Sequence, residues 1–270
     1  MTVLVTGGDG FIGAAVVRRL HALNHHVEVF DRESGADICD THSVYDAVGH
    51  ADAVIHLAGV LGTHELFDTP FKAYDVNVRG TLNVLEGCRA HSAGYVGITM
   101  PQVFPSIYTA TKVAQTRLAS AYNFNHGVPV SHVRAFNAFG PGQHHGVGHP
   151  QKIIPAFADA GWRGEPMPIW GDGEQTVDLV HVDDVARMLV DALEWGDDCT
   201  FDGGTGEAFT VNQVADMVAW TTHSSDRRYL PMRRGEIPTN IVATGEGWDR
   251  LDWRPEFDAG LLADTVRWYA

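Results

Sequence analysis

The stretch VLVTGGDGFIGAAVVRRL, residues 3–20, decides the fold. Residues 3–6 are a short run of strand-favouring side chains, and after a turn the apolar residues recur at helical spacing. Between them stand Gly7, Gly10 and Gly13. In such a turn the first glycine permits a tight bend, the second lets the backbone approach a pyrophosphate, and the third lets helix and sheet pack closely. The stretch therefore predicts a strand, a phosphate-binding turn and a helix.

An acidic residue follows the next predicted strand, residues 27–30. Asp31 lies eighteen residues beyond Gly13, near the spacing of about 20 at which a carboxylate meets ribose hydroxyls. A glycine-rich turn by itself is equally consistent with no ligand, but strand, helix and acid together favour a dinucleotide. The Asp31 carboxylate repels a 2′-phosphate, so NAD is favoured over NADP, and Arg32 directly after it weakens that preference.

Strands and helices alternate through the first half of the chain, which predicts a doubly wound parallel sheet (Rossmann fold). Only six positions pass between Asp31 and Asp37, too few for a crossover helix. The second and third strands are therefore joined unusually, or the third is vestigial. The predicted strands are residues 3–6, 27–30, 53–57, 95–99 and 128–134, and the predicted helices are residues 11–23, 41–48, 73–90 and 106–122.

The character of the sequence changes after residue 139. The stretch GPGQHHGVGHP, residues 140–150, holds four glycines and two prolines, which is typical of a loop. We therefore expect a dinucleotide-binding domain over residues 1–140, completed by a helix and a strand near 183–204. A smaller α/β substrate domain is expected over residues 141–270, with the predicted helices 185–195, 210–220 and 259–268.

Composition excludes several classes of protein. The chain has 270 residues, 29.4 kDa and a net charge of −15, which argues against a nucleic-acid surface or a polybasic membrane face. Its apolar runs fall short of the ~20 residues of a membrane span. The start resembles no signal peptide and the three cysteines suit a reducing compartment, so a cytoplasmic location is expected. No metal is expected either, because Gln143, His144, His145 and His149 lack a carboxylate or thiol to complete a set.

Tyr108 and Lys112 stand four residues apart in YTATK, on a predicted helix. They therefore share one face, about 6 Å apart at Cβ. A nearby ammonium lowers the pKa of a tyrosine. Such a tyrosine can exchange a proton with a sugar or alcohol hydroxyl while a hydride moves to or from nicotinamide, and the lysine can hold the nicotinamide ribose. An isolated pair of this kind is more often structural, but its place downstream of a dinucleotide turn favours catalysis.

These motifs, in this order, resemble the extended short-chain dehydrogenase/reductase family, specifically the NAD-dependent nucleotide-sugar epimerases and dehydratases. The resemblance covers nearly the whole chain. TGGDGFIG (6–13) resembles the family's TGGxGFIG, HLAG (56–59) its HLAA, and NVRGT (77–81) its NVxGT. The cofactor-binding residues that the resemblance and the motifs imply are Gly7, Gly10, Phe11, Ile12, Gly13, Asp31, Arg32, Asp37, Ile38, Leu57, Ala58, Gly59, Asn77, Tyr108 and Lys112.

The resemblance also implies a substrate site and a dimer. RAFNAFGPGQ (134–143) is similar to RxxNxYGPxQ, so Asn137 is expected to touch the substrate's diphosphate. RRGE (233–236) is similar to RxGE, so Arg233 is expected to hold phosphate. The helices near 73–90 and 106–122 resemble those that form a four-helix bundle in family homodimers.

Four positions depart from the family pattern. Met100 stands where the family has a catalytic serine or threonine, and its neighbour Thr99 is the candidate helper of Tyr108. Pro101 and Gln102 stand where dehydratases carry Asp-Glu, so dehydration is not expected. Val177 replaces an arginine that would bind diphosphate.

The sequence thus predicts NAD-dependent epimerisation of a nucleotide sugar, at C4 of a UDP-hexose. Two alternatives stay open. One is a keto-sugar reductase, which consumes NADH or NADPH. The other is an NAD-binding protein that has lost catalysis, as Met100 and Val177 suggest.

Overall fold

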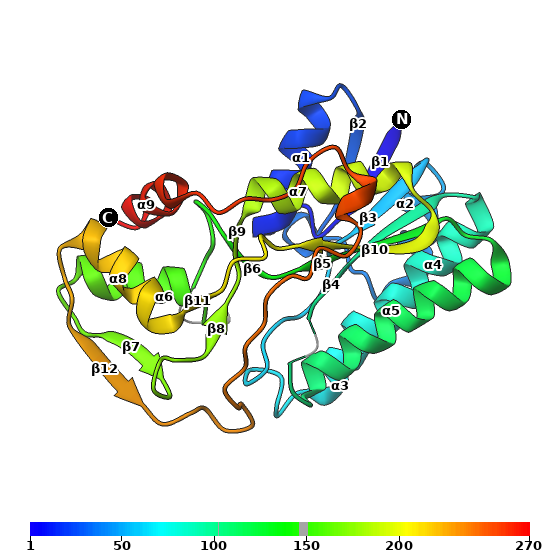
Figure 1. Cartoon of the computed structure of the whole chain (residues 1–270). Helices are drawn as coiled ribbons and strands as arrows, with labels where there is room; N and C mark the ends of the chain where they lie inside the picture. The colour runs from blue at the N-terminus through cyan, green and yellow to red at the C-terminus, as the bar shows by residue number, and fades with distance from the viewer. Residues whose placement is uncertain (102, 146–150) are drawn as a thin grey trace.

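The computed structural model describes residues 1–101, 103–145 and 151–270. A parallel sheet with the strand order β10-β5-β4-β3-β1-β2 lies at its centre (Figure 1). The fold is doubly wound α/β, as predicted. The strands of this sheet are β1 (Thr2–Thr6), β2 (His26–Phe30), β3 (Ala53–His56), β4 (Gly94–Thr99), β5 (Val130–Ala135) and β10 (Asp197–Gly203).

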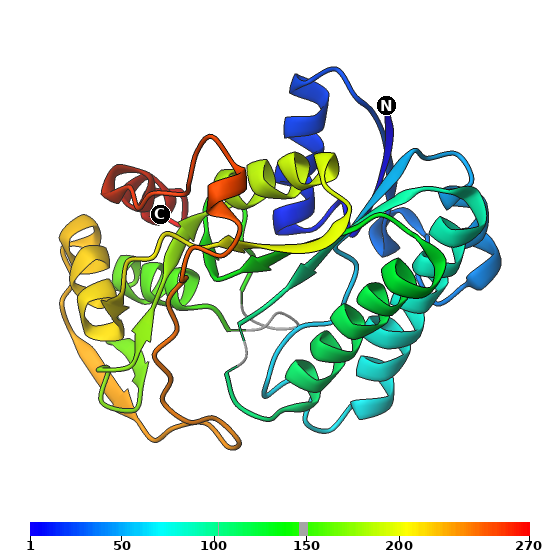
Figure 2. The same ribbon diagram turned by 45° about the vertical axis from the view of Figure 1, so that its right-hand side comes forward.

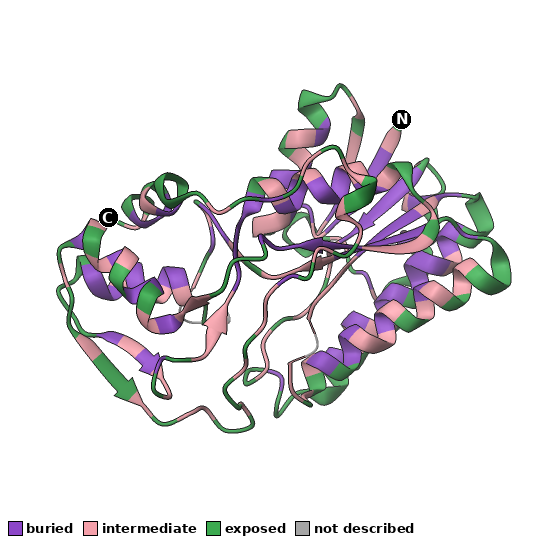
Figure 3. Cartoon of the chain, viewed as in Figure 1, coloured by how far each residue is buried: buried purple, intermediate pink, exposed green. Residues whose placement is uncertain are grey.

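Helices cover both faces of the sheet (Figure 2). Val3 and Val5 belong to the core under α1 (Phe11–Ala22) and α7 (Val182–Asp191). Leu4, between them, belongs to the core under α2, α4 and α5, because successive side chains of a strand point to opposite faces. Figure 3 shows the buried residues concentrated in the sheet and on the helix sides that face it. These further helices are α2 (Thr41–Val48), α4 (Gly80–His91) and α5 (Ile107–His126).

A smaller lobe packs three helices around its own core (Figure 1). Phe157, Met167 and Val214 are buried there. Its strands form two-stranded pairs, β6 with β9, β7 with β12, and β8 with β11. The elements are β6 (Asn137–Phe139), α6 (Ile153–Trp162), β7 (Met167–Trp170), β8 (Thr176–Val177), β9 (Leu179–His181), β11 (Phe209–Thr210), α8 (Val211–Thr222), β12 (Arg227–Leu230) and α9 (Ala259–Trp268).

The chain returns to the sheet after its first passage through the smaller lobe. There α7, the short helix η3 (Ala192–Glu194) and β10 join the sheet layer, and η4 (Trp248–Arg250) packs near β10. Asp202, fully buried, accepts hydrogen bonds from Arg134 and from backbone amides of residues 244–246. The division of the chain at residue 140 stays a prediction.

The segment between β2 and α2 explains why the sequence leaves no room for a crossover helix after Asp31. It holds the short helix η1 (Arg32–Ser34) and turns, with no strand, so β2 forms the edge of the sheet. Ile38 is buried against α4, where a side chain at Gly80 would come within 2.8 Å of it. The Asn83 amide donates to the Ile38 carbonyl at 3.0 Å. In place of the expected strand, the chain therefore forms a turn that packs directly on α4.

The predicted helix over residues 73–90 is interrupted. The chain forms α3 (Pro70–Ala73), a π-helical segment η2 (Tyr74–Arg79) and then α4. Wider π turns occur often at functional sites. Here the Thr81 hydroxyl donates to the Asn77 carbonyl at 2.6 Å, while the Asn77 side chain reaches out of the helix. Across the described part of the chain, no helix is both long and apolar enough to cross a membrane.

Candidate functional site

The glycine turn joins the end of β1 to α1 in a conformation that excludes side chains. Gly7 has φ +73°, and a Cβ there would lie 2.7 Å from the Ala58 nitrogen. A Cβ at Gly13 would lie 2.1 Å from the Gly7 carbonyl oxygen. Gly10 is the N-cap of α1 and has no side chain to cap the first-turn amides of residues 11–13. Those amides and the positive end of the helix dipole suit a pyrophosphate.

Asp31 lies beside this turn. One of its oxygens accepts from the Asp9 amide at 3.0 Å, and the other accepts from the Glu33 amide at 3.0 Å. Each carboxylate oxygen can accept a second hydrogen bond, so both keep capacity for ribose hydroxyls. Arg32 is exposed, and Asp37 accepts from the Cys39 amide at 2.9 Å. The turn and the acid therefore fit the diphosphate and adenosine ribose of a dinucleotide.

Buried hydroxyls and a histidine fix the ends of β1 and β3. The Thr6 hydroxyl accepts from the amides of residues 57–58 at 3.2 Å and contacts His56 Nδ1 at 2.7 Å. His56 Nε2 lies 3.0 Å from the Thr81 hydroxyl. Burial, with a smaller effect of the Lys112 ammonium, lowers the pKa of His56 to about 3. A neutral His56 thus holds the predicted cofactor loop, residues 57–59, against the glycine turn.

Asn77 ties the same loop to α5. Its Oδ1 accepts from the Val60 amide at 2.8 Å, and its Nδ2 donates to the Val60 carbonyl at 3.0 Å and to the Thr111 hydroxyl at 3.1 Å. Thr111 in turn donates to the Tyr108 carbonyl at 2.9 Å. Gly59 leaves room for this amide, since a Cβ there would lie 3.1 Å from Asn77 Oδ1. Both N–H donors of Asn77 are used inside the protein, so it acts on the site by holding the loop.

Tyr108 and Lys112 lie in the first half of α5, whose N-cap Ser106 accepts from the Thr109 amide at 3.0 Å. Burial raises the pKa of Tyr108 to about 12 and lowers the pKa of Lys112 to about 7. The Lys112 ammonium donates to Gln115 Oε1 at 2.6 Å, one turn further along the helix. The expectation that Lys112 lowers the pKa of Tyr108 is therefore wrong: burial prevails, and the lysine is held by Gln115.

Thr99 ends β4 with its hydroxyl directed to the middle of α5. It accepts from the Thr116 hydroxyl at 3.1 Å. Thr116 is eight residues beyond Tyr108, which is about 12 Å along the helix axis. The structure thus does not join Thr99 to Tyr108 by a hydrogen bond, and its role as a helper stays a prediction.

A cavity of about 290 Å³ opens between the two lobes. Arg233 lies on its wall, with its guanidinium 5.8 Å from the centre of the Trp170 ring. Lys152 also lines it. Val177, which stands where the family pattern has an arginine, contributes an apolar side chain to the wall. Asn137 is exposed on β6 and is not among the described residues that line the cavity. The structure therefore places Arg233, but not Asn137, on this cavity.

Glu236 connects the two lobes at the edge of this cavity. It accepts from Arg233 Nε at 2.7 Å and from the Thr63 hydroxyl at 2.5 Å. Close by, the Phe67 ring lies where a side chain at Gly235 would come within 2.6 Å of it. The Arg234 guanidinium stands 4.9 Å from the centre of the same ring. The loop that carries Arg233 is thus anchored on the loop that follows β3.

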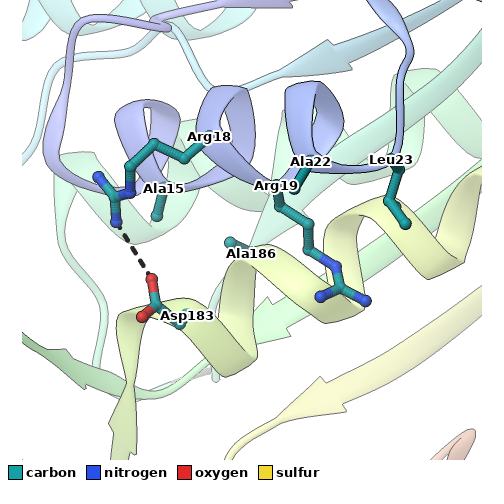
Figure 4. A pocket seen from close by; sticks show the side chains of 7 residues that line it. All are labelled: Ala15, Arg18, Arg19, Ala22, Leu23, Asp183 and Ala186. Atoms are coloured by element: carbon teal, nitrogen blue, oxygen red, sulfur yellow. Dashed lines mark hydrogen bonds and ion pairs between the residues drawn. The ribbon is translucent and has the colours of Figure 1, made fainter.

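A second hollow, of about 330 Å³, lies between α1 and α7 (Figure 4). Arg18 donates to Asp183 at 3.1 Å across it, and Arg19 lines it. None of the predicted site residues lines it. Ligands of doubly wound sheets bind at the carboxyl ends of the strands, where the strand order reverses. Here that point is between β1 and β3, so we place the site at the glycine turn and the neighbouring interlobe cavity.

Within residues 1–101, 103–145 and 151–270, no three His, Cys, Asp or Glu side chains form a group that could hold a metal ion. His149 of the predicted loop, and Gln102 beside Met100, lie outside these residues. Sequence reasoning did not single out Thr6, Thr81 or Gln115. The first two lie within the matched motifs TGGDGFIG and NVRGT, whereas no pattern marks Gln115.

The doubly wound sheet, the glycine turn and the tyrosine–lysine helix define an NAD-dependent enzyme of the Rossmann class. The family model of the NAD dependent epimerase/dehydratase family matches residues 3–99 and 98–201. The chain belongs to this family, and its cofactor is NAD. Its glycine turn, Asp31 and loop 57–59 fit that cofactor.

Related proteins include both kinds of enzyme in the family's name. A putative UDP-glucose 4-epimerase of Methanocaldococcus jannaschii is 28% identical over 294 residues, covering 95% of this chain and 94% of that protein. The UDP-glucose 4-epimerase of Thermus thermophilus, in complex with NAD, is 26% identical with a TM-score of 0.85, covering 100% and 99% of the two chains. A dTDP-glucose 4,6-dehydratase of Streptomyces venezuelae with NAD bound is 26% identical with a TM-score of 0.87, covering 100% and 97%.

Proposed function

We propose that the protein epimerises a nucleotide sugar, at C4 of a UDP-hexose, by transient transfer of a hydride to NAD. One observation carries the proposal: Thr111 and Asn77 link the helix of Tyr108 and Lys112 to the loop beside the glycine turn. The helix that carries the proton-transfer pair is thus joined by hydrogen bonds to the loop of the cofactor site. The similarity to UDP-glucose 4-epimerases supports the choice of substrate.

Tyr108 takes the proton of the sugar hydroxyl and returns it after the keto sugar has turned over in the site. NAD, when bound, supplies the hydride acceptor and later the hydride donor. Because burial holds the pKa of Tyr108 at about 12, the phenolate needs a positive charge close to its oxygen. Lys112 lies on the same helix face. Its ammonium has three N–H donors, and Gln115 accepts one of them, which leaves two for ribose and tyrosine hydroxyls.

The interlobe cavity is the proposed substrate site. Arg233 supplies a cation for the diphosphate, and Trp170 offers an aromatic face. Two features weaken the grip on phosphate. Glu236 shares the charge of Arg233, and Val177 contributes none. We therefore expect weaker binding of nucleoside diphosphates than a site with two unpaired arginines would give.

Loss of catalysis is the second candidate. Met100 has no proton to relay, and the hydroxyl of its sequence neighbour Thr99 is bound to Thr116. A lapsed enzyme binds NAD without turnover. Dehydration is not proposed, since Pro101 stands where dehydratases carry an aspartate.

The experiment is an NMR assay of purified protein with NAD and a panel of UDP-, dTDP- and GDP-sugars. We expect a new anomeric signal from a UDP-hexose, with no net change in the cofactor, and its loss in Tyr108→Phe. The couplings of the product identify the inverted carbon. Silence across the panel with NAD bound supports the lapsed enzyme. Stoichiometric oxidation of NADH or NADPH with a keto sugar supports a reductase instead.

We also propose that the protein is a homodimer through α4 and α5. Phe71 and Tyr74 precede α4 and are exposed, and Phe124 on α5 is 89% exposed. Exposed large apolar side chains on the helices of one layer favour an interaction surface.

A further inference from the structure

Lys112 is enclosed by the sheet and by its own helix. It is 7% exposed, and Gln115 Oε1 accepts from its ammonium at 2.6 Å. Gln115 is itself 3% exposed. A charged hydrogen bond between two buried groups contributes more than a neutral one. The ammonium is therefore anchored on a residue of the same helix, seven positions beyond Tyr108.

Among the side chains near Lys112, Gln115 provides the hydrogen-bond acceptor for the ammonium. Tyr95 on β4 lies beneath it, and Gln115 Nε2 contacts the Tyr95 hydroxyl at 3.5 Å. Burial raises the pKa of Tyr95, so it stays a neutral phenol. His56 on β3 is neutral as well, and Tyr108 on α5 is protonated at neutral pH. With no negative charge on these three neighbours, the amide oxygen of Gln115 stabilises the charge of Lys112.

We infer that Gln115 is a positioning residue that keeps Lys112 protonated and fixes its ammonium beside the cofactor site. The inference rests on the proposed function, in which Lys112 binds ribose and supplies charge to Tyr108. Replacing the amide with an apolar side chain leaves the buried ammonium without this acceptor, which favours neutral lysine. Replacing it with a carboxylate supplies a counter-charge and favours the ammonium. The two substitutions should therefore move the titration of Lys112 in opposite directions.

The test follows that titration directly. The chain has only three lysines, Lys72, Lys112 and Lys152, so NMR of protein labelled with 13C at lysine Cε gives three signals. Lys112→Arg assigns the buried one, and exposed Lys72 is an internal reference. In Q115L the titration midpoint of Lys112 should fall by about one pH unit. This is the shift expected when a hydrogen bond that stabilises the ammonium is lost. In Q115E it should rise above the wild-type midpoint.

The matched control is Thr116→Val, which removes a hydroxyl on the same helix that does not contact the ammonium. It should leave the Lys112 midpoint unchanged. NAD affinity, measured by calorimetry between pH 6 and 9, should decrease as Lys112 loses its proton. This decrease should begin at a lower pH in Q115L than in the wild type, and at a higher pH in Q115E. An unchanged Lys112 midpoint in Q115L overturns the inference. Absence of sugar turnover by the wild-type protein contradicts the proposed function alone, because the lysine titration is read without substrate.

Discussion

Lys112 links stability to pH because burial lowers its pKa from 10.5 to about 7. Between these values the unfolded chain binds more protons than the folded one, so the free energy of unfolding rises with pH. Below pH 7 the full cost of burying the ammonium is present. Lys112→Met should therefore raise the free energy of unfolding by about 1–3 kcal/mol at pH 6, and this gain should shrink toward pH 10.

Urea unfolding of both proteins from pH 6 to 9.5 measures that difference. Lys72→Met, at an exposed position, is the control and should change neither the stability nor its pH dependence. A Lys112→Met protein that is less stable than wild type at pH 6 would show that Lys112 stabilises the fold. The expected result is the opposite: a residue kept for its chemistry at a cost in stability.

Single residues also show what sequence can and cannot predict. Gly7 and Gly13 were predictable because the steric need of a strand–turn–helix is local, and a Cβ at either would clash with backbone. The pKa of Tyr108 was not. The spacing of YTATK indicates a shared helix face, but burial and the Lys112–Gln115 hydrogen bond depend on β4 and on packing that spacing does not contain.

At the scale of elements, the π-helical segment η2 connects the loop that follows β3 with helix α5. It carries Asn77, which makes three side-chain hydrogen bonds to Val60 and Thr111. Asn77→Ala leaves the Val60 amide and carbonyl and the Thr111 hydroxyl without this partner in a buried place. We expect a loss of about 2–3 kcal/mol in the free energy of unfolding, already without NAD, measured by chemical denaturation.

Asn77→Asp separates this holding role from direct contact with the cofactor. A carboxylate still accepts from the Val60 amide but cannot donate to the Val60 carbonyl, so its stability should also fall. If either variant bound NAD weakly but unfolded like the wild type, Asn77 would be a cofactor contact and the holding role would be refuted.

Elements of the two lobes were predictable to different degrees. The strands of the central sheet are four to seven residues long, long enough for a pattern to be visible, although β10 (DDCTFDG) is polar and was placed only within the stretch 183–204. In the smaller lobe β8 and β11 have two residues each, too few for any periodicity. Helix α6 was missed as well. Its ten residues are apolar on nearly all sides and include Pro155 and Gly161, which favour a loop when read locally.

At the scale of the whole molecule, one face of α5 looks outward with a stripe in which apolar residues lie on both sides of Arg117. Ala110, Arg117, Ala121 and Phe124 are exposed there, at spacings of seven, four and three residues that place them on one side of the helix. Exposed surface helices normally carry polar residues on this side. The stripe lies on the helix layer that the family resemblance assigns to a dimer, so both arguments point to one surface.

Ala121→Glu tests that surface with little risk to the fold, because glutamate is a good helix former. Light scattering coupled to size exclusion should give twice 29.4 kDa for the wild type and a shift to monomer for Ala121→Glu, since a larger, charged side chain in place of alanine at the centre of the interface disrupts its packing. The matched control is Ala22→Glu at an exposed position of α1, on the opposite face of the sheet, which should stay dimeric. A wild type that is monomeric at tens of micromolar, or an Ala121→Glu protein as dimeric as Ala22→Glu, would remove α5 from the interface.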